Sequence, residues 1–116
     1  MILGNLLKAV SSTVGTGISL KNATKSAPNS MGCYKIYYHG LKYVGKSEDG
    51  IRKRFVQYYN GTTAHYPSAK KIYQHRNEIT VTWQVCNSRE ETRALEAKWI
   101  RQYDPEWNDR RGWESD

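Results

Sequence analysis

Two neighbouring segments of the chain are rich in aromatic and β-branched side chains. They span residues 32–38 and 41–45, and the dipeptide His39-Gly40 separates them. Side chains of these types favour strands, and a two-residue break that contains glycine is typical of a tight hairpin turn. The pattern therefore predicts an antiparallel β-hairpin.

The turn also determines which residues oppose each other across the hairpin. The predicted pairs are Tyr38 with Leu41, Ile36 with Tyr43, and Tyr34 with Gly45. Directly opposed residues share a face of a sheet, so Tyr34 and Tyr43 should lie diagonally adjacent on one face. Gly45 has no side chain and should leave open space beside the Tyr34 hydroxyl.

Four further elements are predicted after the hairpin. Residues 51–59 and 69–75 have the spacing of helices, and strict alternation over residues 78–85 is typical of a half-buried strand. A capping box at residues 88–91 marks the start of a last helix. That helix should end before Pro105, because a proline cannot continue it.

The resulting order, β-β-α-α-β-α, indicates an α+β fold with a small three-stranded antiparallel sheet flanked by helices. We expect residues 31–116 to form this domain. Before it, residues 2–10 have apolar side chains at roughly helical spacing, and residues 11–30 have the Ser, Thr, Gly and Asn content of a linker. Residues 1–30 are therefore expected to form an N-terminal arm or linker whose order the composition leaves open.

Positive charge is concentrated in the first three quarters of the chain, which has 116 residues, a formal net charge of +7 and a pI of about 9.5. Residues 1–86 carry 12 Lys or Arg and 3 Asp or Glu, a net +9, whereas residues 87–116 carry 6 and 8, a net −2. DNA or RNA is a natural partner for the basic part, because neutralised phosphates release counterions. A basic protein without such a partner is the alternative.

The cysteines and the apolar residues bear on the compartment. Cys33 and Cys86 match no disulfide framework, and their spacing relative to His65 and His75 matches no known zinc-ligand pattern. The sequence contains no run of 18 apolar residues. We therefore expect a protein that acts in the cytoplasm and does not enter a membrane.

Five segments resemble the motifs of one enzyme family. The first three are Gly32-Cys33-Tyr34-Lys35-Ile36, Tyr43-Val44-Gly45-Lys46-Ser47 and Ile51-Arg52-Lys53-Arg54-Phe55, followed by Leu95-Glu96-Ala97-Lys98-Trp99-Ile100 and Asn108. In this order and at this spacing they resemble the GIY-YIG nuclease family. The resemblance covers residues 32–108, essentially the whole predicted domain.

The resemblance implies a catalytic set and a metal ligand. The implied catalytic residues are Tyr34, Tyr43, Arg54, Tyr58, Glu96 and Asn108. Tyr34 would accept a proton from the attacking water, which requires nearby cations that favour its phenolate. Arg54 would bind the scissile phosphate, with Tyr43 beside it. Glu96 would hold one Mg²⁺ or Mn²⁺ ion, since these hard ions prefer carboxylate oxygen and water.

Three positions depart from the family pattern, and each catalytic residue also has an ordinary structural interpretation. Cys33 and Val44 are apolar replacements of the motif's isoleucines, whereas Tyr58 stands where many members have a histidine that titrates near neutral pH. The two hairpin tyrosines could simply pack across the strands. Glu96 could be a surface residue at the edge of an apolar stripe, and Asn108 could brace the turn after a proline.

A second group of residues is predicted to bind the nucleic-acid backbone: Lys46, Lys53, His65, Lys70, Lys71 and Arg76. Basic side chains interleaved with Tyr66 and Tyr73 are typical of surfaces that bind phosphates and stack on bases. A solvated charged surface is the alternative interpretation.

The sequence thus predicts a divalent-metal-dependent endonuclease that hydrolyses phosphodiester bonds of DNA, with RNA as the alternative substrate. One rival is a nucleic-acid-binding module that keeps the fold without turnover. Another is a nuclease toxin domain delivered into a target cell, with residues 1–30 as the remnant of a fusion or delivery partner. Sequence specificity and oligomeric state remain open, because no separate groove-reading motif accompanies the domain.

Overall fold

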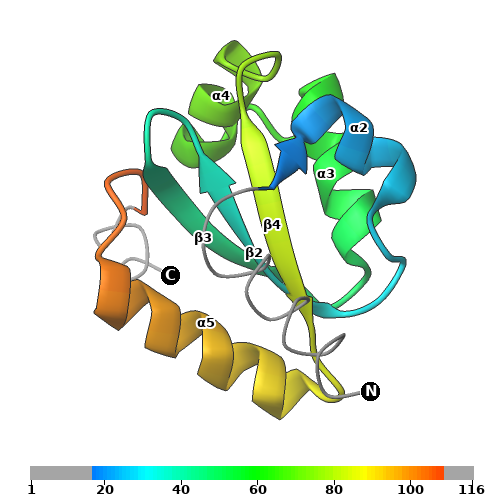
Figure 1. Cartoon of the computed structure of the whole chain (residues 1–116), viewed down its shortest axis with the longest axis vertical. Helices are drawn as coiled ribbons and strands as arrows, with labels where there is room; N and C mark the ends of the chain where they lie inside the picture. The colour runs from blue at the N-terminus through cyan, green and yellow to red at the C-terminus, as the bar shows by residue number, and fades with distance from the viewer. Residues whose placement is uncertain (1–16, 109–116) are drawn as a thin grey trace.

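A four-stranded antiparallel sheet in the order β1-β4-β2-β3 forms the centre of the protein (Figure 1). The structure is a computed structural model and describes residues 17–108. The strands are β1 (Ile18–Ser19), β2 (Gly32–Tyr37), β3 (Leu41–Ser47) and β4 (Thr80–Val85). The predicted α+β class is confirmed, and β1 adds a fourth strand to the three that the sequence predicts.

Helices cover both faces of this sheet. They are α2 (Leu20–Ser26), α3 (Ile51–Asn60), α4 (Pro67–Gln74) and α5 (Arg89–Tyr103). Helix α5 lies along one face, against β2 and β3, and α2 and α3 pack together on the other side (Figure 1). Within residues 17–108, no helix has the length and apolar character needed to cross a membrane.

The hairpin register is as predicted over most of its length. Tyr34 lies opposite Gly45, and Ile36 lies opposite Tyr43. At the turn the register shifts, so that Leu41 pairs with Tyr37 and not with Tyr38. The predicted two-residue turn is therefore wrong in detail. His39 adopts a left-handed conformation with φ of 53°, and an irregularity in the ladder absorbs the extra residue.

Residues 17–30 differ most from the expectation, because they belong to the folded unit and not to a separate arm. The Leu20 amide donates to the carbonyl of Ile79 over 2.9 Å. The side chains of Leu20, Ala23 and Ala27 have no exposed surface and enter the main core. Ser19 caps α2 by accepting a hydrogen bond from the Asn22 amide. Residues 1–16 lie outside the described part of the chain.

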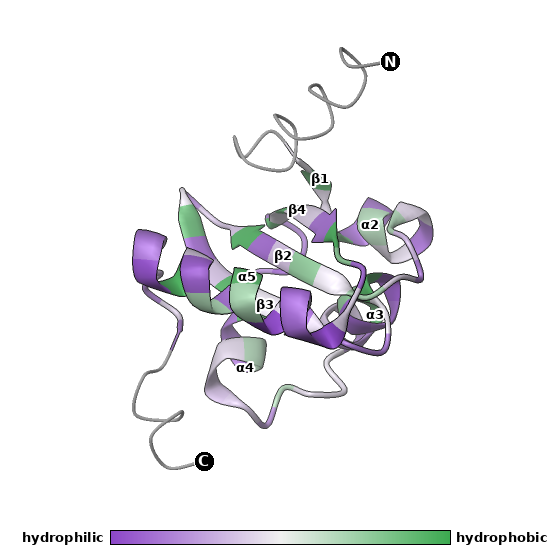
Figure 2. Cartoon of the chain, turned by 90° about the horizontal axis from the view of Figure 1, so that it is seen from below, coloured by the Kyte–Doolittle hydropathy of each residue, from purple (hydrophilic) through white to green (hydrophobic). Residues whose placement is uncertain are grey.

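The two faces of the sheet bury different side chains. The main core lies between the sheet and the α2–α3 layer and includes Tyr34, Ile36 and Phe55. Beneath α5 a smaller cluster contains Trp99 and also encloses Lys35, whose Nζ lies 4.4 Å from the centroid of the Trp99 ring. Burial lowers the pKa of Lys35. The strand β2 accordingly changes between hydrophobic and hydrophilic colour along its length (Figure 2).

The remaining predicted elements are present with small shifts at their ends. Helix α4 begins at Pro67, two residues before the predicted start, because proline suits the first turn of a helix. Strand β4 begins at Thr80, two residues after the predicted start. Helix α5 begins where the capping box predicts, with the Ser88 hydroxyl accepting a hydrogen bond from the Glu91 amide.

Candidate active site

Tyr34 lies at the centre of the candidate site, on the middle strand β2 and fully buried. Its ring extends over Gly45 on the neighbouring strand, and a Cβ atom at Gly45 would collide with the Tyr34 hydroxyl. The sequence predicts open space beside the Tyr34 hydroxyl at Gly45. In the structure the end of the Tyr34 ring occupies that space. Gly45 is needed here because of this close approach of the ring to the backbone.

A second tyrosine meets Tyr34 at its reactive oxygen. The hydroxyl of Tyr58 on α3 lies 2.6 Å from the hydroxyl of Tyr34, and either oxygen can be the donor. Phe55, one turn earlier on α3, packs its ring edge-on against Tyr34, with ring centroids 5.3 Å apart. Burial is the largest cause that raises the pKa of Tyr34 and of Tyr58. Both groups are therefore neutral phenols at neutral pH.

Tyr43 on β3 stands diagonally beside this pair, as the hairpin register predicts. Its ring centroid lies 6.4 Å from that of Tyr34. The negative charge that Tyr58 would carry as a phenolate raises the pKa of Tyr43 most, and burial raises it further. A hydrogen bond with the hydroxyl of Ser68 on α4 lowers the pKa of Tyr43. Ser68 is absent from the predicted site, since its sequence position after Pro67 indicates only the start of a helix.

Arg54 lies on α3, and its guanidinium group is the positive charge that acts on the three tyrosines. Its Nε atom is buried and has no hydrogen-bond partner among residues 17–108. Burial alone would lower the pKa of Arg54, but the negative charges that Tyr34 and Tyr58 would carry outweigh it and raise the pKa. A buried donor without an acceptor is costly for a folded protein. A phosphate oxygen is the kind of acceptor that this guanidinium group suits best.

Glu96 supplies a carboxylate from α5. Its side chain is half-buried, and no hydrogen bond or ion pair joins it to another residue in the part of the chain that the structure describes. Burial raises the pKa of Glu96, and the charges of Lys46 and Arg54 partly oppose this. The carboxylate therefore faces two cations without an ion pair to either.

This carboxylate fits a hydrated divalent cation. Among residues 17–108, no three His, Cys, Asp or Glu side chains converge in a group able to hold a metal ion. Mg²⁺ usually keeps several waters and takes one or two carboxylates together with phosphate oxygens of its substrate. An ion of this kind needs from the protein only what Glu96 offers. Glu96 could therefore hold such an ion.

Asn108, which the sequence places in the catalytic set, makes two hydrogen bonds to strand β3. Its Oδ1 accepts from the Val44 amide over 3.0 Å, and its Nδ2 donates to the Val44 carbonyl over 2.9 Å. The preceding Trp107 amide donates to the Lys42 carbonyl over 2.8 Å. Residues 107–108 therefore pair with the outer edge of β3, and Asn108 braces the strand between Tyr43 and Gly45.

The predicted backbone-binding residues fall into separate groups. Lys70 and Lys71 are exposed on α4, and His65 is exposed on the loop before it. Lys53 is exposed on α3, and its Nζ lies 3.7 Å from Oδ2 of Asp49.

Arg76 is occupied within the protein. Its guanidinium carbon lies 4.1 Å from the centroid of the Tyr73 ring, and its Nη1 donates to the Tyr73 carbonyl. Because these contacts hold the guanidinium group against the protein, Arg76 is less available to a phosphate than the exposed lysines of α4.

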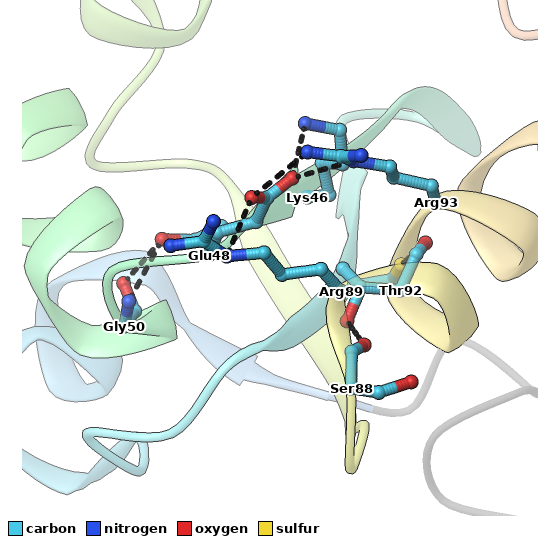
Figure 3. Close-up of polar contacts among 9 residues, drawn as sticks. Lys46, Glu48, Gly50, Ser88, Arg89, Thr92 and Arg93 are labelled. Atoms are coloured by element: carbon cyan, nitrogen blue, oxygen red, sulfur yellow. Dashed lines mark hydrogen bonds and ion pairs between the residues drawn. The ribbon is translucent and has the colours of Figure 1, made fainter.

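Lys46 belongs to an ion-pair network that is absent from the sequence-based prediction (Figure 3). Its Nζ lies 3.2 Å from Glu48, which also contacts Arg89 and Arg93. The two arginines are four residues apart and thus on one side of α5. That spacing is visible in the sequence, but their meeting with Glu48 depends on the fold.

Comparison with known proteins gives the family. Residues 30–109, about two thirds of the chain, match the family described as the UvrC-like GIY-YIG domain. The chain belongs to the UvrC-like GIY-YIG domain family. The match begins just before β2, so β1 and α2 precede the part of the GIY-YIG domain that it covers.

Curated relatives of this GIY-YIG domain are much longer proteins. UvrABC system protein C of Streptomyces avermitilis is 31% identical over 83 residues, which cover 70% of this chain and 12% of that protein. The protein of the same name from Shewanella frigidimarina is 30% identical over 95 residues, which cover 80% of this chain and 15% of that protein. The chain therefore spans about an eighth of the length of these relatives.

Solved structures have the same fold as this GIY-YIG domain. The GIY-YIG N-terminal endonuclease domain of UvrC from Thermotoga maritima, bound to its catalytic divalent cation magnesium, has a TM-score of 0.64 and 24% identity. The alignment covers 78% of this chain and 96% of that domain. A point variant of the same domain gives a TM-score of 0.63 at the same identity. At this level of identity the likeness establishes the fold.

Proposed function

We propose that this GIY-YIG domain is a divalent-metal-dependent endonuclease that hydrolyses phosphodiester bonds of DNA. One observation carries the proposal: within residues 17–108 the half-buried Glu96 carboxylate has no ion pair, and the charge of Arg54 acts on it while the buried Nε of Arg54 has no acceptor. A carboxylate for a cation and a free donor for a phosphate oxygen are the two groups that metal-assisted phosphodiester hydrolysis needs. Solved relatives are described as endonuclease domains bound to a catalytic divalent cation.

A cation held by Glu96 would polarise the scissile phosphate and favour loss of a proton from a nearby water. Tyr34 is the proton acceptor in the proposed reaction, taking the water's proton at its hydroxyl oxygen as a phenolate. Tyr58 supports that phenolate by donating across their 2.6 Å contact. The hydroxide oxygen bonds to phosphorus, the P–O3′ bond breaks, and O3′ takes a proton from solvent.

Arg54 and Tyr43 orient the substrate in this proposal. Arg54 donates from Nε to a non-bridging oxygen of the scissile phosphate and offsets the charge that develops there. Tyr43, whose ring lies beside that of Tyr34, donates to the same phosphate or to the attacking water. Lys70 and Lys71 on α4 contact the backbone further along the strand, where their charge supplies affinity without sequence preference.

Cytoplasmic action is part of the same proposal. Cys33 and Cys86 are both free thiols and both buried. Free cysteines are the rule in a reducing compartment, where an intracellular nuclease meets its substrate.

The test is a cleavage assay on supercoiled plasmid, linear duplex, single-stranded DNA and RNA, each with Mg²⁺, Mn²⁺ or EDTA. The proposal expects nicked plasmid with either metal, none with EDTA, and products that end in 5′-phosphate and 3′-hydroxyl groups. Binding of DNA without cleavage under any metal condition would instead favour a nucleic-acid-binding module without turnover. Cleavage of RNA alone would overturn the choice of DNA.

A further inference from the structure

Four charged side chains from β3, α5 and the segment after β3 meet in one network (Figure 3). The Glu48 carboxylate receives Lys46 Nζ at 3.2 Å and Arg89 Nε at 3.4 Å. Arg93 approaches the same carboxylate in a two-point contact, with Nε 3.1 Å from Oε2 and Nη2 3.4 Å from Oε1. One carboxylate thus gathers three cations from β3 and α5.

The cations are more exposed than the acid that gathers them. The Glu48 side chain is 20% exposed, whereas those of Arg89 and Arg93 are 72% and 60% exposed. With Glu96, whose charge also acts on Lys46 and Glu48, two negative charges meet three positive ones, a surplus of one. Exposed ion pairs of this kind contribute little to stability, so the two arginines can exchange partners at low cost.

This group of cations adjoins the residues proposed to cut DNA. Lys46 follows Gly45 on β3, and its positive charge acts on the Glu96 carboxylate and opposes the rise in the pKa of Glu96. Arg93 precedes Glu96 by three residues on α5, so the two side chains lie on the same side of that helix. A DNA strand whose scissile phosphate lies between Glu96 and Arg54 would bring a neighbouring phosphate towards Lys46, Arg89 and Arg93.

We propose that Lys46, Arg89 and Arg93 form a second phosphate site, which binds a backbone phosphate next to the scissile one, and that Glu48 occupies this site until DNA arrives. The proposal rests on the proposed nuclease function and extends its DNA contacts from α4 to α5. The two-point contact of Arg93 with a carboxylate is the geometry that arginine also uses for phosphate. Glu48 keeps the three cations together and competes with the incoming phosphate.

The test measures binding of a fluorescent DNA duplex in EDTA, where no cleavage occurs, over a range of salt concentrations. Arg89→Gln and Arg93→Gln should each weaken binding and reduce the slope of log affinity against log salt by about 0.9, the value for one lost phosphate contact. Lys25→Gln is the matched control, since Lys25 is exposed on α2 on the other side of the sheet. Arginine variants that bind like this control would overturn the proposal.

Glu48→Gln tests the competition directly. Removing the negative charge should tighten DNA binding several-fold at low salt, because the cations then face the phosphate without a competitor. Weaker binding by Glu48→Gln, in a protein with the wild-type melting temperature, would overturn the competitive role. A wild-type protein that neither binds nor cuts DNA would reject the proposed function itself. Normal cutting with unaffected arginine variants would reject only the second phosphate site.

Discussion

The hydroxyl oxygens of Tyr34 and Tyr58 lie 2.6 Å apart, and both residues are buried. This contact joins the central strand to α3 at the oxygen proposed to accept a proton. Each phenol is the other's hydrogen-bond partner, and burial raises the pKa of both. At neutral pH the proposed base, Tyr34, is therefore a neutral phenol. Its ionisation requires further positive charge beside it, which a bound cation would supply.

Replacing either phenol with Phe should separate catalysis from packing. Tyr34→Phe removes one oxygen and leaves the ring in place, so the fold should survive while the cleavage rate falls by ~10²-fold or more. Tyr58→Phe should lower the rate less, because it removes a donor to the phenolate and not the base. Plasmid nicking and thermal melting of both variants check this. Lower stability of Tyr34→Phe with full activity per folded molecule would mean that Tyr34 only packs.

Gly45→Ala should displace Tyr34. A Cβ atom at this position would meet the end of the Tyr34 ring, so the ring or the strand must move. We expect a loss of stability of about 1–3 kcal/mol, the usual cost of overpacking, together with a large loss of activity. Gly40→Ala is the control, because no atom of residues 17–108 lies within 4 Å of its added Cβ and any cost comes from its φ of 101°. Equal activity of the two variants would contradict the close approach.

The cleavage rate should rise with pH through the neutral range. The proposed reaction needs the phenolate of Tyr34, and burial raises the pKa of this group, so the reactive fraction increases as protons are removed. Under single-turnover conditions at saturating metal, log rate should increase by about 1 per pH unit, and Tyr34→Phe should abolish most of this dependence. A wild-type rate that is constant from pH 6 to pH 9 would exclude Tyr34 as the base.

Leu20→Ala tests whether residues 17–30 belong to the folded unit. The Leu20 side chain is fully buried in the main core, so its truncation should cost about 2–5 kcal/mol in free energy of unfolding. Chemical denaturation measures this cost. The neighbouring Lys21 is exposed, and Lys21→Ala should stay within about 0.5 kcal/mol of the wild type. A similarly small effect of Leu20→Ala would restore the arm that the sequence suggests.

Local patterns predict the parts of the fold that depend on neighbours in sequence. The pairing of Tyr34 with Gly45 follows from a nearby turn and from alternation, and the start of α5 follows from one capping box. Helix α2 does not stand out in this way, because it buries only Leu20 and Ala23 in an otherwise polar segment. Its attachment depends on Ile79, which is 59 positions away from Leu20.

Contacts between residues far apart in sequence also limit how much of the candidate active site the sequence can predict. Family motifs single out Tyr34, Arg54 and Glu96, and the structure brings charge and burial together around them. The sequence cannot show that Glu48 meets an arginine 45 positions later, because that contact requires both β3 and α5 in place. It also does not show that Asn108 makes two hydrogen bonds to Val44, 64 positions earlier, because that contact requires β3 in place.

The most direct test of the account is plasmid nicking by Glu96→Gln in Mg²⁺ and in Mn²⁺. The variant keeps the shape of the side chain but loses the charge proposed to hold the ion, so nicking should nearly vanish while DNA binding in EDTA stays equal or becomes tighter. Glu90→Gln, an exposed carboxylate on the same helix, should nick at close to the wild-type rate. Full nicking by Glu96→Gln, with either metal, would contradict the claim that this domain cuts DNA through a cation held by Glu96.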